Sequence, residues 1–271
     1  MTRIIFKSSL SDEMRDNILA RLKQIEIDNN VRIIFAIESG SRAWGFPSPD
    51  SDYDARFVYA RRVEDYLTLN PVRDVIELPI EGDYDINGWD IKKALNLLLK
   101  PNPVLLEWLS SPIRYMWNDE QCEQLISFSK KLSHGPASLH HYINLGKNIW
   151  RHNIDRAEGV KLKKYFYVLR PAMALRWIRM NPDQIPPMNF QDLMAGVDLP
   201  APLLSELQDL LRAKAQTNEL GTGQRNSRLD AFILEEFAQA EALTKIIRVE
   251  RQGLRAQADA LFRKLIMPSE A

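Results

Sequence analysis

The sequence has a single cysteine, no long apolar run and no net charge across its 271 residues. Because Cys122 stands alone, no intramolecular disulfide can form, which favours a reducing, cytoplasmic setting. No stretch approaches the roughly 20 apolar residues of a membrane-spanning helix. The first residues also lack the apolar core and cleavage site of a signal peptide. We therefore expect neither a secreted disulfide scaffold nor a membrane protein.

Two widespread catalytic motifs are also absent. There is no Gly-rich phosphate loop ending in Gly-Lys-Ser/Thr and no Gly-x-Ser-x-Gly elbow, which argues against a P-loop NTPase and a hydrolase. What remains is an ordinary globular composition, 45% hydrophobic and 27% charged. A chain of this length can form one large domain or two modest ones.

Charge is unevenly distributed along the chain. Residues 1–110 carry 14 Lys and Arg against 18 Asp and Glu, whereas residues 111–271 carry 22 against 18. Within the second half, residues 147–179 hold 9 basic and 2 acidic side chains. An acidic first half followed by a basic helical stretch suits a protein that brings metal ions and polyanions together. A solvated, charged helix face would give the same counts.

The first 115 residues alternate between helical and strand patterns. Residues 9–30 have apolar positions at helical spacing, and residues 31–38 are a dense apolar run typical of a buried strand. Further strands are expected at 53–60 and within 72–80 and 82–87, and further helices at 89–100 and 102–111. This alternation indicates an α/β or α+β domain.

From Asp119 onward the pattern is almost wholly helical. Helices are expected at 119–132, 138–154, 160–180 and 228–266, with the polar residues 221–227 as a loop or linker. We therefore predict two domains, residues 1–115 with the mixed pattern and residues 116–271 with helices.

A pair of aspartates marks the start of the second expected strand. Side chains alternate between the two faces of a strand, so Asp52 and Asp54 project from one side and Arg56 follows on it. Adjacent carboxylates repel each other unless a cation lies between them, and Mg²⁺ prefers such oxygen ligands. Asp52 and Asp54 are thus candidate ligands of Mg²⁺ or Mn²⁺, of the kind used in phosphoryl transfer. Arg56 would orient a carboxylate or contact a phosphate.

Gly40 and Ser41 follow the first expected strand, at the start of a short helix. A glycine lets the backbone approach a phosphate closely, and Ser41 adds a hydroxyl and an N–H group at the positive helix end. We interpret this pair as a triphosphate cradle, and include the adjacent Arg42 among the nucleotide-binding candidates. A solvated turn is the competing interpretation.

Residues 40–58, GSRAWGFPSPDSDYDARFV, resemble the DNA polymerase β-type nucleotidyltransferase superfamily, in which Gly-Ser precedes Asp-x-Asp after a spacer. Residues 85–115 and 161–178 are similar to the predicted nucleotidyltransferases of the YcgL-like group, which is related to RNA-repair-associated polymerase β-like proteins. The resemblance covers roughly residues 30–180. It implies a nucleotidyltransferase-type mixed sheet flanked by helices, so we predict an α+β fold with an all-helical C-terminal domain.

The superfamily resemblance also implies a third carboxylate on a neighbouring strand, as a metal ligand or as general base for the attacking hydroxyl. Asp85 and Asp90 are the two candidates. The subgroup places its acidic strand residue eight positions before a helix lysine, which matches Asp85 and Lys93. Asp90 begins the following helix, where an acidic residue also caps favourably. Asp85 is favoured, and Asp90 is the alternative.

A basic helix face is a further candidate for nucleotide binding. Lys163, Tyr167 and Arg170 recur at i, i+4 and i+7 and therefore share one helix face, with Lys164 beside it. This face would suit the phosphates of an NTP or an RNA backbone, and Tyr167 would stack on a base. A solvated basic face is again the alternative.

These features together predict a metal-dependent nucleotidyltransferase. It would transfer an NMP from an NTP substrate to an acceptor hydroxyl and release pyrophosphate. An RNA end is the favoured acceptor, on the resemblance and the basic helix. The alternatives are a non-catalytic nucleotide-binding or antitoxin-like regulator of the same fold, and an aminoglycoside-type adenylyltransferase, which would favour an acidic acceptor pocket. The sequence defines no oligomeric state.

Overall fold

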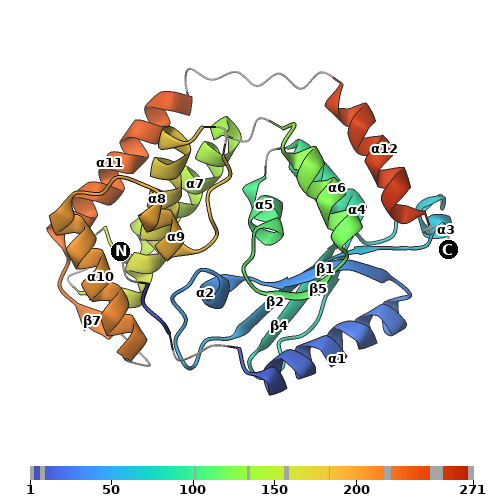
Figure 1. The fold of residues 1–271 in the computed structure, drawn as a ribbon, viewed down its shortest axis with the longest axis horizontal. Helices are drawn as coiled ribbons and strands as arrows, with labels where there is room; N and C mark the ends of the chain where they lie inside the picture. The colour runs from blue at the N-terminus through green and yellow to red at the C-terminus, as the bar shows by residue number, and fades with distance from the viewer. Residues whose placement is uncertain are drawn as a thin grey trace. The chain divides into compact units, whose positions relative to one another are not determined.

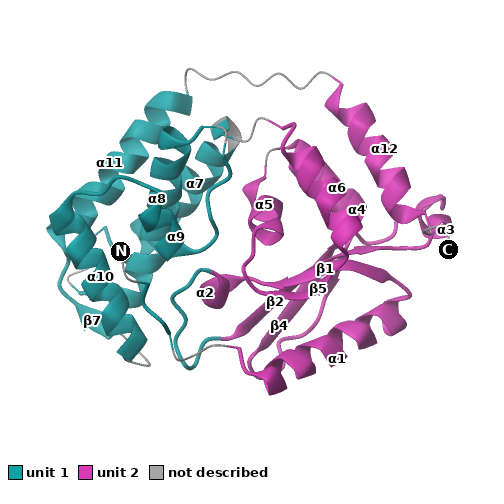
Figure 2. Ribbon diagram, viewed as in Figure 1, with its two compact units in different colours: residues 1–8, 44–51, 133–249 teal, residues 9–43, 52–132, 250–271 magenta. Residues whose placement is uncertain are grey.

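The computed structural model describes residues 3–6, 10–100, 102–132, 135–155, 159–182, 184–216, 221–244 and 253–267, apart from the side chains of residues 136 and 137. The chain folds into two compact units (Figure 2). Residues 9–43, 52–132 and 250–271 form one, which we call the α/β unit. Residues 1–8, 44–51 and 133–249 form the other, the helical unit.

A five-stranded sheet forms the centre of the α/β unit, with the strand order β3-β4-β2-β1-β5. Only β2 and β4 run parallel among these neighbours, so the sheet is mixed. The α+β class predicted from the sequence is confirmed. The strands are β1 (Arg32–Glu38), β2 (Tyr53–Ala60), β3 (Val75–Glu77), β4 (Tyr84–Asp90) and β5 (Arg114–Trp117).

Helices cover both faces of this sheet (Figure 1). On one face lies α1; on the other lie α4 and α6, with α12 packed against both. The connections also include three shorter helices, of which α2 directly follows β1. The bounds are α1 (Asp12–Asn29), α2 (Gly40–Ala43), α3 (Val63–Tyr66), α4 (Ile91–Leu99), α5 (Pro103–Leu109), α6 (Asp119–Ser129) and α12 (Leu254–Ile266).

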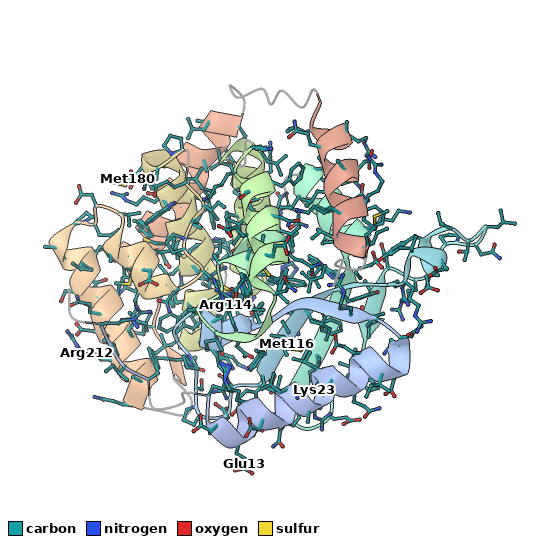
Figure 3. The ribbon with its side chains drawn as sticks, turned by 45° about the vertical axis from the view of Figure 1, so that its right-hand side comes forward. Glu13, Lys23, Arg114, Met116, Met180 and Arg212 are labelled. Carbon is teal, nitrogen blue, oxygen red and sulfur yellow. The ribbon has the colours of Figure 1, made fainter. Side chains whose placement is uncertain are left out.

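The predicted helix at 9–30 forms α1, and Ser11 caps it by accepting from the backbone N–H of Met14. Its apolar stripe of Ile18, Leu22 and Ile25 is buried against the sheet. The opposite side of α1 carries charged residues such as Glu13 and Lys23, which point away from the sheet (Figure 3). This amphipathic pattern is what fixes the face of α1 that packs on the strands.

The alternation along β2 decides which residues face α1. Ala55, Phe57 and Ile86 of β4 belong to the cluster that contains the buried residues of α1. Because strand side chains alternate, Asp54, Arg56 and Asp85 point to the opposite face. These three polar residues of β2 and β4 are therefore gathered on the face of the sheet opposite α1.

Three long helices, α7, α8 and α11, pack against one another in the helical unit. A two-stranded ribbon of β6 and β7 also belongs to it, so this unit is not entirely helical. The elements are α7 (Gly135–Asn153), α8 (Leu162–Met180), α9 (Phe190–Ala195), α10 (Ala201–Gln216), α11 (Ser227–Thr244), β6 (Val160–Lys161) and β7 (Thr222–Gly223).

The chain between α2 and β2 belongs to the helical unit. Phe46 lies in its apolar core and stacks on Phe166 with ring centroids 4.9 Å apart. The N–H of Phe190 donates to the carbonyl of Trp44 at 2.8 Å. Lys214, only 2% exposed, donates to the hydroxyl of Ser48. Residues 44–51 are thus anchored by α8, α9 and α10.

The two units do not follow the single division at residue 115 that the sequence suggested. Helix α6 belongs to the α/β unit because its apolar face, including Cys122 and Leu125, is buried there. Helix α12 also belongs to that unit. The expected helix at 228–266 gives α11 and α12, with residues 245–252 outside the described part of the chain. Among the described residues, no helix is long and apolar enough to cross a membrane.

Candidate active site

Two of the predicted carboxylates lie side by side on neighbouring strands. In the parallel pairing of β2 with β4, Asp54 is the register partner of Asp85. Both side chains are about one-quarter exposed, 26% for Asp54 and 29% for Asp85. Asp52 precedes β2 and is exposed. The structure therefore brings Asp54 and Asp85 together on one face, with Asp52 two residues before Asp54.

Arg56 bridges this pair of carboxylates. Its Nη2 donates to Asp54 Oδ1 at 3.1 Å and to Asp85 Oδ2 at 2.7 Å. Its Nη1 donates to the carbonyl oxygens of Ala55 and Asp85. The orienting role expected for Arg56 matches these contacts, because its guanidinium fixes both carboxylates at once.

The electrostatics of Asp54 reflect its crowded position. Burial raises the pKa of the Asp54 carboxyl above its ordinary value, Arg56 opposes this, and the negative charges of Asp85 and Asp52 raise it further. A cation bound between adjacent carboxylates removes their mutual repulsion, so such a pair favours cation binding. The site is therefore set up to hold positive charge.

Gly40 lies directly against Asp54. Its φ is +58°, and a Cβ atom there would be 1.9 Å from Asp54 Oδ2. Only glycine combines this left-handed backbone with so close an approach. The N–H of Ser39 also donates to the carbonyl of Asp54 at 2.8 Å. The start of α2, with Gly40 and Ser41, is thus placed at the carboxylate pair, as the sequence spacing predicted.

A buried carboxyl beneath Asp54 was not anticipated. Glu38, at the end of β1, is 0% exposed. Its Oε1 accepts from the backbone N–H of Asp54 at 3.0 Å and its Oε2 accepts from the hydroxyl of Tyr115 at 2.5 Å. Burial raises the pKa of Glu38 to about 7, against the lowering effect of these hydrogen bonds. Glu38 therefore ties β1 to β5 and to the backbone of Asp54.

Asp90, the alternative third carboxylate, lies away from Asp54 and Asp85. It is the register partner of Tyr59, five residues along β4 from Asp85, or about 17 Å at the rise of a strand. It is 3% exposed, caps α4 through the N–H of Lys92 and accepts from the hydroxyl of Tyr66. Burial raises its pKa. The geometry brings Asp85, and not Asp90, to Asp54.

Two arginines predicted to bind nucleotide are directed inward. Arg42 is 7% exposed, and its guanidinium lies 3.9 Å from the ring centroid of Tyr53. Arg170 is 3% exposed, donates from Nε to the carbonyl of Met188 and lies over the ring of Trp44. Both guanidiniums are therefore engaged within their own units.

The rest of the expected basic face on α8 is only partly exposed. Lys163 is exposed, Lys164 lies over the ring of Tyr167 at 5.6 Å, and Tyr167 packs edge-on against Trp44. The side chains become less exposed along the helix, from the exposed Lys163 to the buried Arg170, so they do not form a continuous basic surface. The i, i+4, i+7 spacing holds, but the face turns into the core of the helical unit.

The donor set suits a hard divalent cation, with Asp54 and Asp85 in register and Asp52 nearby. In the described part of the chain, however, no cluster of three or more His, Cys, Asp or Glu side chains is arranged to hold a metal ion. The guanidinium of Arg56 lies between Asp54 and Asp85 and donates to both. The residues fit a cation chemically once Arg56 releases them.

The mixed sheet, the Gly-Ser turn and the paired strand aspartates define a polymerase β-like nucleotidyltransferase class. The chain belongs to the RNA repair pathway DNA polymerase beta family, whose family model matches residues 14–264.

It is similar to "Uncharacterized protein YcgL" of Bacillus subtilis (strain 168), at 41% identity over 92% of this chain and 95% of the relative. A nucleotidyltransferase-like protein from Exiguobacterium sibiricum 255-15, known from a crystal structure, aligns with 84% of this chain and 74% of its own at 12% identity. The TM-score of this alignment is 0.27.

Proposed function

We propose that this protein is a metal-dependent nucleotidyltransferase that moves an NMP from an NTP to an acceptor hydroxyl. The observation that carries the proposal is the register pairing of Asp54 with Asp85, with Gly40 packed directly against Asp54. A phosphate seated at Gly40 and Ser41 would lie next to the carboxylates. Membership of a polymerase beta family supports this reaction class.

Asp52, Asp54 and Asp85 would hold Mg²⁺ or Mn²⁺, which would supply charge stabilisation at the phosphoryl oxygens when bound. Gly40 and Ser41 would hold the triphosphate through backbone N–H groups and the serine hydroxyl. Glu38 would keep the backbone of Asp54 in place through the 3.0 Å hydrogen bond. Arg56 would move from the carboxylates towards a phosphate oxygen.

In the transfer step, the acceptor oxygen forms a bond to the α-phosphorus of the NTP. The bond from that phosphorus to the oxygen bridging the β-phosphate breaks, and pyrophosphate leaves. The hydroxyl proton passes to the carboxylate of Asp85, which acts as general base. The products are the nucleotidylated acceptor, pyrophosphate and a protonated Asp85, which returns its proton to water.

An RNA end is the acceptor we favour. The family takes its description from an RNA repair pathway, and residues 147–179 carry a basic excess. The exposed Lys163 and the half-buried Lys164 are the basic residues of the predicted face that remain available to a phosphate backbone. Arg42 and Arg170 are not part of the proposal, because both are buried.

The test is transfer of label from each α-labelled NTP to cellular RNA in the presence of Mg²⁺ or Mn²⁺. We expect acid-precipitable label with the unaltered protein and its loss, by a factor of at least about 100, in Asp54→Asn and Asp85→Asn. Asp83→Asn is the matched control, because Asp83 is exposed and two residues from Asp85. Asp90→Asn should retain transfer if it folds. Label that persists in Asp54→Asn would contradict the proposal.

A nucleotide-binding regulator of the same fold is the second candidate. The bridge from Arg56 to both carboxylates favours it, because a bound guanidinium replaces the cation that catalysis needs. This candidate predicts NTP binding without release of pyrophosphate, and binding that survives Asp85→Asn. Pyrophosphate release measured beside equilibrium binding separates the two.

A further inference from the structure

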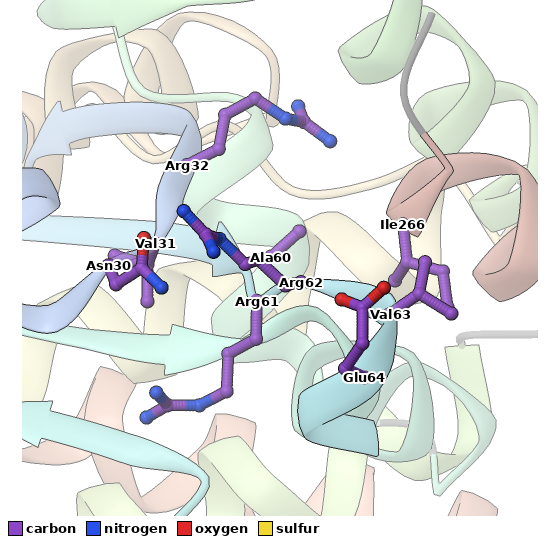
Figure 4. A pocket seen from close by; sticks show the side chains of 9 residues that line it. All are labelled: Asn30, Val31, Arg32, Ala60, Arg61, Arg62, Val63, Glu64 and Ile266. Atoms are coloured by element: carbon purple, nitrogen blue, oxygen red, sulfur yellow. The ribbon is translucent and has the colours of Figure 1, made fainter. Parts of the chain in front are cut away.

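A cavity lies where β1 begins and β2 ends, at the end of β2 away from Asp54. It has a volume of about 540 Å³ and lies wholly within the α/β unit (Figure 4). Residues at the start of β1 and at the end of β2 line the cavity, together with residues of α3 and α12. The lining residues are Asn30, Val31, Arg32, Ala60, Arg61, Arg62, Val63, Glu64 and Ile266.

This cavity is separate from the carboxylate site. Ala60 follows Asp54 by six residues along β2, which corresponds to about 20 Å at the rise of an extended strand. Arg32 is the register partner of Ala60, so both strand ends meet at the cavity. A ligand bound here would not be the NTP whose α-phosphate reacts at Asp54.

Arginine dominates the charge of the lining, with three guanidiniums against the single carboxylate of Glu64. Arg61 has an ion-pair partner, since its Nε lies 3.7 Å from Asp90 Oδ2. Among the described residues, Arg32 donates to two neutral acceptors, the amide oxygen of Gln121 and the carbonyl of Leu265. The charge of Arg32 is therefore not balanced by either hydrogen-bond partner.

Arg62 is the most available of the three. It is exposed and directly precedes α3. Figure 4 shows Arg32 and Arg62 projecting from the two strand ends, with Glu64 on α3. Arg32 on β1 and Arg62 just before α3 each bring a forked donor to the lining, of the kind that binds phosphate oxygens.

Apart from Asn30, the remaining lining residues are apolar. Val31, Ala60, Val63 and Ile266 line the cavity beside the arginines. A volume of this size falls within the roughly 300–1,000 Å³ range of small-ligand pockets. An apolar wall next to paired guanidiniums suits a ligand with a phosphate and a flat or aliphatic body, such as a mononucleotide.

We propose that this cavity is a second binding site for a phosphate-bearing ligand of mononucleotide size, held by Arg32 and Arg62. The proposal goes beyond the transfer reaction and does not depend on it. The ligand is either a free nucleotide or one nucleotide of an RNA strand, because both present the same phosphate and ribose chemistry. Glu64 opposes the ligand's charge and lowers its affinity.

The test is equilibrium dialysis of the full chain with the divalent metals chelated. The probes are each labelled ribonucleoside 5′-monophosphate and, separately, a short unstructured RNA with a 5′-hydroxyl. We expect Arg62→Ala to weaken binding at least about tenfold, and Glu64→Gln to strengthen it. Arg255→Ala is the matched control, because Arg255 is an exposed arginine eleven residues from Ile266 on α12 and should leave binding unchanged.

The two arms identify the source of the phosphate. Monophosphate binding that depends on Arg62 assigns the cavity to a free nucleotide, and RNA binding alone with that dependence assigns it to a nucleotide of an RNA strand. Failure of both probes to bind, or equal affinity in Arg62→Ala and the unaltered protein, overturns the proposal. Arg32→Ala is a less clean variant, because it also removes two hydrogen bonds within the unit.

Discussion

Gly40 and Asp54 are so close that a single methyl group on Gly40 would overlap the carboxylate of Asp54. The contact would be 1.9 Å to Oδ2, from a residue whose φ is +58°. The Gly-Ser turn and the Asp-x-Asp strand are thus one packed arrangement, although Gly40 and Asp54 are separated by a segment that belongs to the helical unit.

Gly40→Ala should abolish transfer, because the new methyl group displaces the Asp54 carboxylate. We expect a fall in transfer of about 100-fold or more, equivalent to about 2.7 kcal/mol. Gly82→Ala is the matched control, since Gly82 has a φ of +60° and nothing within 4 Å of an added Cβ. Both variants carry the strain of a left-handed alanine, so equal losses in the two would show that strain, and not the clash, is responsible.

Glu38 should make the metal-free protein less stable as the pH rises. Its carboxyl has an ordinary value of 4.5, and burial raises the pKa to about 7. Between these values the folded state binds more protons than the unfolded state, so stability is greatest below 4.5 and falls as pH approaches 7. The slope is at most about 1.4 kcal/mol per pH unit.

Glu38→Gln removes this titration while keeping an oxygen to accept from the N–H of Asp54. The free energy of unfolding of the variant, relative to the unaltered protein, should increase by about 3 kcal/mol across that pH window. Urea denaturation in the presence of a chelator measures it. Stability curves that stay parallel with pH would show that Glu38 does not titrate there.

Cys122 should be unreactive in the folded protein. It is fully buried on α6, with its Sγ 3.9 Å from the carbonyl oxygen of Ile34, and burial raises the pKa of the thiol to about 12. Alkylation at mildly alkaline pH should be about 1,000-fold slower than in guanidinium chloride, because the thiolate is the reactive form. Rapid labelling of the folded chain would mean that α6 leaves the sheet readily.

Glu236 should be among the most sensitive positions of the helical unit. It is 0% exposed and accepts hydrogen bonds from Arg176 at 2.8 Å and Arg179 at 2.6 Å. Glu236→Ala would leave both guanidiniums without this carboxylate, at a cost of about 3–5 kcal/mol. Glu241→Ala on the same helix removes a half-exposed partner of Lys147 and should cost less than about 1 kcal/mol. Denaturant midpoints of the two variants provide the comparison.

The strands that carry the site were predictable because their signals are local. The expected strand at 53–60 coincides with β2, and the run at 31–38 gives β1. Strand β5 was missed, since RYMW follows a short helix and lacks an alternating pattern. Its place beside β1 is set by long-range pairing that no local pattern encodes.

The site itself was predicted in part. Asp85 was the favoured third carboxylate, and its pairing with Asp54 agrees with that choice, although its role stays a prediction. Glu38 was not predicted as part of the site. The sequence did hold a signal for it, because Glu38 is a single acidic residue at the end of an apolar strand. Arg42 and Arg170 were expected to face a nucleotide, but both side chains are buried. The periodicity that selected Arg170 places a residue on a helix face without saying whether that face is buried.

The winding of the chain between the two units has a consequence for synthesis. The chain passes from one unit to the other five times, and α12 of the α/β unit follows the entire run 133–249 of the helical unit. A nascent chain that has completed β1 to β5 therefore still lacks a helix that packs on α4 and α6. On the ribosome, the α/β unit is completed last, after the helices of the other unit have already emerged.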